Sequence, residues 1–197
     1  MTWRQMMSPT WQRYGGLQDS LMDDELRRKV YDKLFPNGEP SSETLATTIE
    51  LYKVMVASSE ALVARRQGVN TFFLTLNGVV LTALGLIAGK GLVSYLEVFG
   101  LIGLSVTGGI LALAWRGLLV SFSQLNTGKF AVINQIEAFL PAAVYAGEWV
   151  ALGEGKRSDL YKSSTSRELW TPKTFFVVYC LATLLEVLAL LHIIPTA

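Results

Sequence analysis

The chain has 197 residues, of which 51% are hydrophobic, and 17 basic and 16 acidic residues leave a net charge of +1. This balance lacks the basic excess typical of nucleic-acid-binding proteins, so we expect no direct nucleic-acid partner. The chain has one cysteine, Cys180, and one histidine, His192. This count excludes a disulfide framework and a zinc site built from cysteines or paired histidines within one chain. We therefore expect no metal site.

The first 40 residues are polar and charged. They do not follow the order of basic tip, apolar core and small-residue cleavage site that defines a signal peptide. Asp19 to Leu34 predicts a short charged helix, and the turn residues from Phe35 to Pro40 end it. We expect residues 1–40 to be a cytosolic segment, with the first membrane span serving for insertion.

A second helix is expected after Pro40, where Ser41 and Ser42 can cap its first turn. Apolar residues then recur at spacings of three and four from Leu45 to Val63, which predicts an amphipathic helix. Only Gly68 separates this helix from an apolar run. Residues 41–128 are therefore predicted to form an amphipathic helix that runs into a transmembrane hairpin, with spans at about 70–88 and 93–115.

Three apolar runs dominate the rest of the chain: Thr71 to Ala88, Val93 to Trp115 and Thr174 to Ile194. A helix needs about 20 apolar residues to cross a bilayer. We therefore predict an all-α integral membrane protein with three transmembrane helices and long cytosolic helical extensions. Residues 129–172 are expected to be a cytosolic helical segment, and residues 173–197 the third span with an external C-terminus.

Basic residues set the expected orientation. Arg65 and Arg66 precede the first span, Arg116 follows the second, and five more lysines and arginines fall between residues 129 and 167. The link between the first two spans carries only Lys90. By the positive-inside rule, the N-terminus and the long central segment lie in the cytoplasm.

The most informative polar residues lie inside the spans. Glu186 falls midway along the third run, where an ionised carboxylate costs roughly 2.5 kcal/mol or more. Two interpretations stay open: Glu186 faces a pore or partner, or it is a protonated carboxyl that hydrogen-bonds a neighbouring helix, for example at Asn77. Asn70 and Asn77 share one face of the first span, where they line a polar seam or bond across helices.

Small residues are dense in the first two spans, which predicts close helix packing within one subunit or between subunits. Three helices alone enclose no aqueous pore, so a channel requires a homo-oligomer. The small residues are Gly78, Thr82, Gly85 and Gly89 in the first span, and Gly103, Ser105, Thr107, Gly108, Gly109 and Ala112 in the second.

The sequence carries no motif typical of a catalytic site. The chain has no Gly-x-Ser-x-Gly elbow and no dinucleotide fingerprint, and the loop from Gly153 to Lys156 does not have the spacing of a phosphate-binding loop. His192 is expected to be an interfacial residue at the outer end of the third span. We expect neither an enzyme nor a bound cofactor.

Residues 51–176 resemble a family of small bacterial inner-membrane proteins to which no activity is assigned. The resemblance implies a multi-pass protein of the bacterial inner membrane, with membrane lipid as a partner. It rests on Glu60, Arg65-Arg66, Asn70-Thr71-Phe72-Phe73-Leu74, Leu125-Asn126-Thr127-Gly128-Lys129-Phe130, Ile136-Glu137-Ala138-Phe139-Leu140-Pro141, Glu148-Trp149, Leu152-Gly153-Glu154-Gly155-Lys156, Tyr161, Glu168 and Pro172.

The same resemblance singles out cytosolic polar positions as candidates for gating or docking. A structural role is the alternative, in which charged residues such as Glu137 pair with Arg65 or Arg66 and lock the cytosolic helices together. The candidate positions are Arg65, Arg66, Asn126, Lys129, Glu137, Glu148, Trp149 and Lys156.

The layout of an Arg-rich amphipathic helix, two linked spans and a cytosolic helix is similar to SLATT-type membrane modules, although the third span departs from it. This likeness implies a homo-oligomeric membrane effector or channel-like component, gated through its cytosolic helices, in anti-phage defence. The alternative function is a non-conducting membrane anchor or scaffold. It would recruit a soluble cytosolic protein through Met1 to Phe35 and Asn126 to Trp170.

Overall fold

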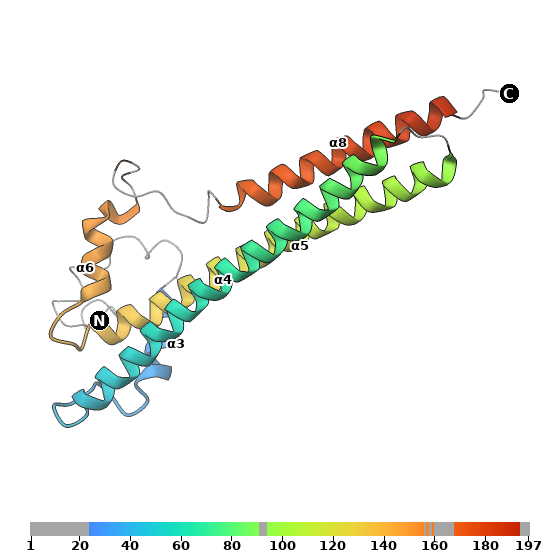
Figure 1. Ribbon diagram of the computed structural model, residues 1–197. Helices are drawn as coiled ribbons and strands as arrows, with labels where there is room; N and C mark the ends of the chain where they lie inside the picture. The colour runs from blue at the N-terminus through green and yellow to red at the C-terminus, as the bar shows by residue number, and fades with distance from the viewer. Residues whose placement is uncertain (1–23, 91–93, 156, 158, 160–167, 194–197) are drawn as a thin grey trace. The chain divides into compact units, whose positions relative to one another are not determined.

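The computed structural model describes residues 24–90, 94–155, 157, 159 and 168–193. These residues form α3 (Asp24–Leu34), α4 (Leu45–Ala88), α5 (Tyr95–Glu137), α6 (Val144–Ala151), the single-turn 3-10 helix η2 (Gly153–Gly155) and α8 (Trp170–Ile193) (Figure 1). The described part of the chain has no strand. The predicted all-α fold is confirmed.

Three of these helices, α4, α5 and α8, are long and apolar enough to cross a membrane. At 1.5 Å per residue, the 44 residues of α4 and the 43 of α5 extend about 65 Å, which is about twice the thickness of a bilayer's hydrocarbon core. Only part of each can therefore lie in lipid. Gly68 lies inside α4 without ending it.

The chain divides into two compact units. We call residues 1–62 and 124–163 the head unit, and residues 63–123 and 164–197 the span unit. The apolar parts of α4, α5 and α8 belong to the span unit, whereas α3, α6, the start of α4 and the end of α5 belong to the head unit.

The span unit is held together by apolar and aromatic packing. One buried cluster contains Val80 and Leu84 of α4, Leu101 of α5 and Tyr179 of α8. A second contains Phe73 of α4 with Trp115 and Leu119 of α5. The rings of Phe73 and Trp115 stack with their centroids 5.9 Å apart.

The head unit has a smaller aromatic core. Tyr31 and Phe35, at the end of α3, contact Phe139, which follows α5. The centroids of Phe35 and Phe139 are 4.8 Å apart in an edge-to-face arrangement. The side chain of Gln135 also donates to the backbone carbonyl of Arg27 at 3.3 Å, so α3 is fastened to the last turns of α5.

Candidate functional site

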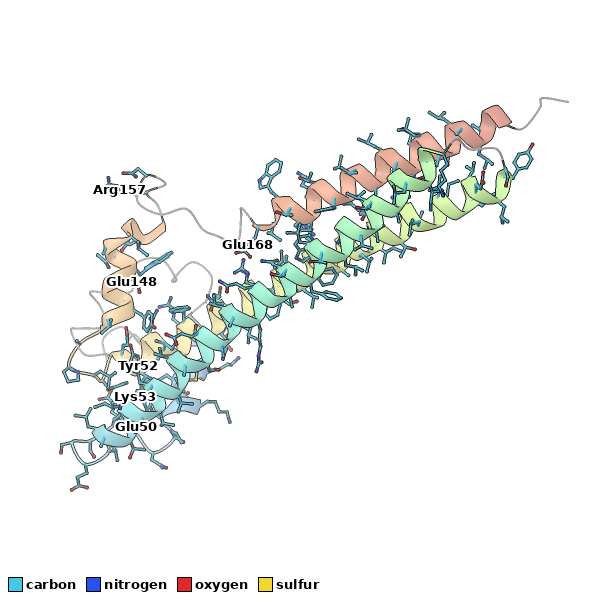
Figure 2. The ribbon with its side chains drawn as sticks, in the orientation of Figure 1. Glu50, Tyr52, Lys53, Glu148, Arg157 and Glu168 are labelled. Atoms are coloured by element: carbon cyan, nitrogen blue, oxygen red, sulfur yellow. The ribbon has the colours of Figure 1, made fainter. Side chains whose placement is uncertain are left out.

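Glu137 is the centre of a polar cluster in the head unit. Its side chain is 1% exposed and accepts a hydrogen bond from the Tyr52 hydroxyl at 2.7 Å. It also accepts bonds from the backbone N–H groups of Tyr145 at 2.9 Å and Ala146 at 3.1 Å. These two groups lie in the first turn of α6, where N–H groups lack partners within the helix. Glu137 thus joins α4, α5 and α6; Figure 2 labels Tyr52 on α4.

The tyrosines of this cluster are hard to ionise. Burial raises the pKa of Tyr52, and the hydrogen bond to the Glu137 carboxylate raises this pKa further. Burial also raises the pKa of Tyr145, with added contributions from the carboxylates of Glu60 and Glu148. Both phenols therefore remain neutral at physiological pH, and Tyr52 remains a hydrogen-bond donor.

Two further polar contacts join α4 to α5 in the head unit. The Ser59 hydroxyl donates to the Asn126 side-chain oxygen at 3.3 Å, and the Lys129 ammonium donates to the Ser58 hydroxyl. Together with Tyr52 and Glu137, these pairs form a row of hydrogen bonds, which we call the head seam.

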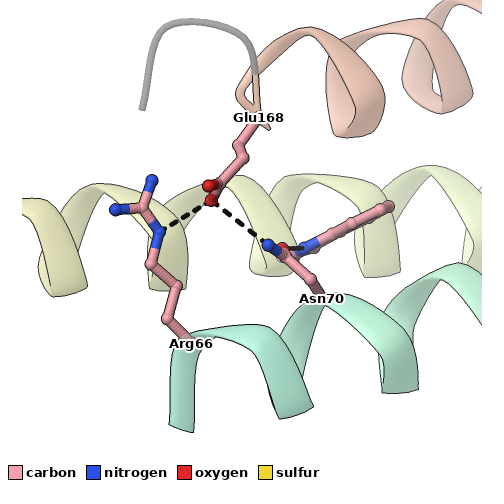
Figure 3. Close-up of polar contacts among 4 residues, drawn as sticks. Arg66, Asn70 and Glu168 are labelled. Atoms are coloured by element: carbon pink, nitrogen blue, oxygen red, sulfur yellow. Dashed lines mark hydrogen bonds and ion pairs between the residues drawn. The ribbon is translucent and has the colours of Figure 1, made fainter. Parts of the chain in front are cut away.

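A network of four residues joins the three helices of the span unit (Figure 3). Arg66 of α4 donates to the Glu168 carboxylate at 2.7 Å, and Asn70 donates to the same oxygen at 3.2 Å. The Asn70 side-chain oxygen accepts a hydrogen bond from the Trp115 indole at 2.9 Å. Because Asn70 bonds in both directions, α4, α5 and Glu168, two residues before α8, are fixed at one level of the unit. We call these residues the Arg66 network.

Glu186 makes a second polar contact within the span unit. Its side chain is 9% exposed, and one carboxylate oxygen accepts a hydrogen bond from the Ser105 hydroxyl of α5 at 2.7 Å. The other oxygen is buried, with no hydrogen-bond partner among the described residues. The helix neighbour of Glu186 is therefore Ser105 rather than Asn77.

Asn77 is fully buried in the second half of α4. Its amide donates to the backbone carbonyl of Phe73 at 2.8 Å, while its side-chain oxygen has no partner among the described residues. The Tyr179 hydroxyl donates to the backbone carbonyl of Asn77 at 3.2 Å. The Tyr179 ring lies against Gly108, where an added Cβ would come within 2.3 Å of ring carbons. Glycine at position 108 thus permits the contact between α5 and α8.

Residues 49–189, which contain all of these clusters, match the profile of the octameric membrane protein family (8xMP). The chain belongs to this family. Membership supports a homo-oligomeric, multi-pass membrane protein, in agreement with the three long apolar helices. No curated protein and no solved structure matches the chain.

Within this member of the octameric membrane protein family, the candidate positions occupy different environments. Glu137, Asn126 and Lys129 lie in the head seam, and Arg66 and Asn70 in the Arg66 network. Of the other cytosolic candidate positions, Arg65 is exposed on α4, Glu148 is exposed on α6 and Trp149 is half-buried on α6. Lys156 lies outside the described residues.

The structure does not have the expected pairing of Arg65 or Arg66 with Glu137. Arg66 forms its ion pair with Glu168, and Glu137 accepts its hydrogen bonds from Tyr52 and the first turn of α6. The physical reason is that Glu137 ends α5 close to the start of α6, where backbone donors need an acceptor.

Sequence reasoning missed several hydrogen-bond partners, among them Tyr52, Ser105 and Trp115. Each of these three had been noted for another reason, Tyr52 in an apolar stripe, Ser105 as a small residue and Trp115 as the end of a span. A polar atom within such a stripe or span is the signal that could have identified them, because buried polar groups require hydrogen-bond partners.

Proposed function

We propose that this chain is a channel-like membrane effector that assembles as an octamer in the bacterial inner membrane. In this proposal the N-terminus and the head unit are cytoplasmic, the head unit gates the assembly, and the protein acts in anti-phage defence. The observation that carries the assembly is the family, whose description names an octamer. The defence role is supported by the layout likeness to SLATT-type modules alone.

Exposed small residues support contacts between subunits. Gly78, Thr82 and Gly85 are exposed on one face of α4, and Gly100, Gly103 and Thr107 on one face of α5. A Cβ added at any of the four glycines would meet no atom of the described residues within 4 Å. The fold of one subunit therefore does not require these glycines, whereas close packing against another subunit's helix would.

The head seam supports gating by the cytosolic helices. In the head seam, a hydrogen bond between neutral groups such as Ser59 and Asn126 contributes about 0.5–1.5 kcal/mol, and a hydrogen bond to the Glu137 carboxylate about 1.5–3 kcal/mol. A ligand that binds an opened form a few kcal/mol more tightly would shift such an equilibrium. The seam is therefore weak enough to respond to a cytosolic signal.

Polar groups in the spans support conduction. Asn77 and Glu186 each carry a buried oxygen without a partner among the described residues, and such groups in a bilayer are costly. A rearrangement that turned them towards water between subunits would satisfy them. The alternative function, a non-conducting scaffold without enzymatic activity, is favoured by their burial within a single chain.

Flux through liposomes tests the proposal. The full chain would be reconstituted in vesicles loaded with a self-quenching dye, and release would be recorded with and without extract from phage-infected cells. We expect release on addition of the extract, and release without extract from Glu137→Ala, which breaks the head seam. The control is Glu50→Gln, which changes an exposed residue of the head unit. Vesicles that stay closed under every condition would contradict conduction and favour the scaffold.

A further inference from the structure

Three exposed basic residues of the span unit lie near the Arg66 network. Arg116 follows Trp115 on α5, Arg65 precedes Arg66 on α4, and Lys173 lies in the first turn of α8. The network joins Asn70, Trp115 and Glu168 at one level of the span unit. Each of the three basic residues lies within about two helical turns of that level, because each is at most five residues from a member of the network. Each helix thus contributes one exposed cation to what we call the basic belt: Arg65, Arg116 and Lys173.

The residues of the basic belt have no acidic partner in the part of the chain that the structure describes. Among the described residues, none of the three forms an ion pair. The carboxylate at this level, Glu168, is bonded to Arg66 and Asn70. The belt therefore presents three positive charges that the described part of the chain does not neutralise.

The basic belt borders an exposed apolar surface. Towards the middle of each span, large apolar side chains are exposed: Phe72 by 60%, Leu113 by 50% and Val177 by 47%. Trp170, one turn before Lys173, is 65% exposed, and the Lys173 ammonium lies 5.0 Å from the centre of its ring. A cation above an apolar surface, with a tryptophan beside it, is typical of the lipid headgroup level.

We infer that the basic belt binds the headgroups of anionic phospholipids, whose acyl chains lie along the exposed apolar faces of α4, α5 and α8. The phosphodiester supplies the negative charge that the three cations lack, and Trp170 packs beside the headgroup. Headgroup binding would hold the spans at a fixed depth. The inference requires only that the chain spans a membrane, so it stands whether or not the assembly conducts.

Native mass spectrometry of the detergent-purified full chain tests this inference. Palmitoyl-oleoyl phosphatidylglycerol and phosphatidylcholine, which have the same acyl chains, would be added in equal amounts, and the lipid retained would be counted. At about fivefold for each surface cation, the three cations should make the wild type retain the anionic lipid in preference by a factor on the order of 100. The variant Arg65→Gln/Arg116→Gln/Lys173→Gln should lose this preference.

The matched control is Arg28→Gln/Lys29→Gln/Lys53→Gln. It removes the same charge from exposed, ion-paired residues of the head unit and should keep the wild-type preference. Equal retention of both lipids by the wild type overturns the inference, as does an unchanged preference in the basic-belt variant. If that variant does not fold, salt decides: a wild-type preference that survives about 1 M NaCl overturns the inference, because salt at that concentration screens exposed charges.

Discussion

In the head unit, the Glu137 carboxylate accepts three hydrogen bonds, whereas in the span unit the Glu186 carboxylate accepts one, with its second oxygen unpartnered among the described residues. Both side chains are buried. The head unit therefore uses its buried carboxylate as a structural centre. Beyond the Arg66 network, the span unit relies instead on packed rings and on the close contact between Gly108 and Tyr179. Polar bonds should thus determine stability in the first unit and shape complementarity in the second.

Removing Glu137 should produce the largest effect. The substitution Glu137→Ala leaves the Tyr52 hydroxyl and two N–H groups of α6 without their acceptor, at a cost of about 3 kcal/mol or more. Hydrogen exchange should show faster exchange at Tyr145 and Ala146, with the span unit unchanged. The control, Glu50→Gln, breaks an exposed ion pair and should leave exchange as in the wild type. If the amides of Tyr145 and Ala146 exchanged in Glu137→Ala as slowly as in the wild type, Glu137 would not be the structural centre of the head unit.

Adding a side chain at Gly108 tests whether close packing stabilises the span unit. In Gly108→Ala, the new methyl group meets the buried Tyr179 ring at 2.3 Å, so we expect a loss of about 1–3 kcal/mol. Thermal unfolding in detergent measures it. The same substitution at Gly117, which is exposed and has no described atom within 4 Å, should not lower the melting temperature. Equal melting temperatures for the two variants would mean that α5 and α8 do not pack as closely as described.

Loss of the Glu186 contact should be milder. Ser105→Ala removes one hydrogen bond between α5 and α8, and such bonds in membranes are worth about 0.6 kcal/mol on average and at most about 1.7. Thermal unfolding of Ser105→Ala in detergent should therefore show a smaller decrease than that of Gly108→Ala. A larger decrease would reverse the comparison and make polar bonding decisive in the spans as well.

Alkaline pH tests the buried hydrogen bond between Tyr52 and Glu137 in the head unit. Burial and Glu137 raise the pKa of Tyr52 above its ordinary value near 10, so the folded state holds this proton more tightly than the unfolded state does. The resulting stability is fully present below about pH 10 and is lost as the pH rises towards the raised pKa. A difference titration of phenolate absorbance, wild type minus Tyr52→Phe, should show a phenol that ionises well above pH 10. A midpoint near 10 would contradict the buried bond.

The fold class was predictable from the sequence because apolar runs and helical periodicity are local signals. Three runs of membrane-spanning length predicted α4, α5 and α8 as the long apolar helices. The polar partners were not predictable in the same way. Tyr52 and Glu137 are 85 residues apart, Arg66 and Glu168 are 102 apart, and Ser105 and Glu186 are 81 apart. No local pattern pairs residues at such separations, since the pairing depends on which faces of the helices meet.

Residue types were nevertheless informative. An acid in a span costs enough to need a hydrogen-bonding neighbour, so Glu186 was recognisable as a special position even though Ser105 was not recognised as its partner. Glu137 was recognisable by resemblance only. Its role depends on the turn between α5 and α6, which brings the first N–H groups of α6 to its carboxylate.

Counting subunits tests the central claim, a homo-oligomeric membrane protein whose exposed glycines form the contacts between copies. Native mass spectrometry would be applied to the wild type, to Gly78→Leu/Gly103→Leu and to the control Gly117→Leu, whose glycine is also exposed and uncrowded. We predict eight subunits for the wild type and the control, and smaller species for the double variant. A wild type that is monomeric in every detergent would contradict the account.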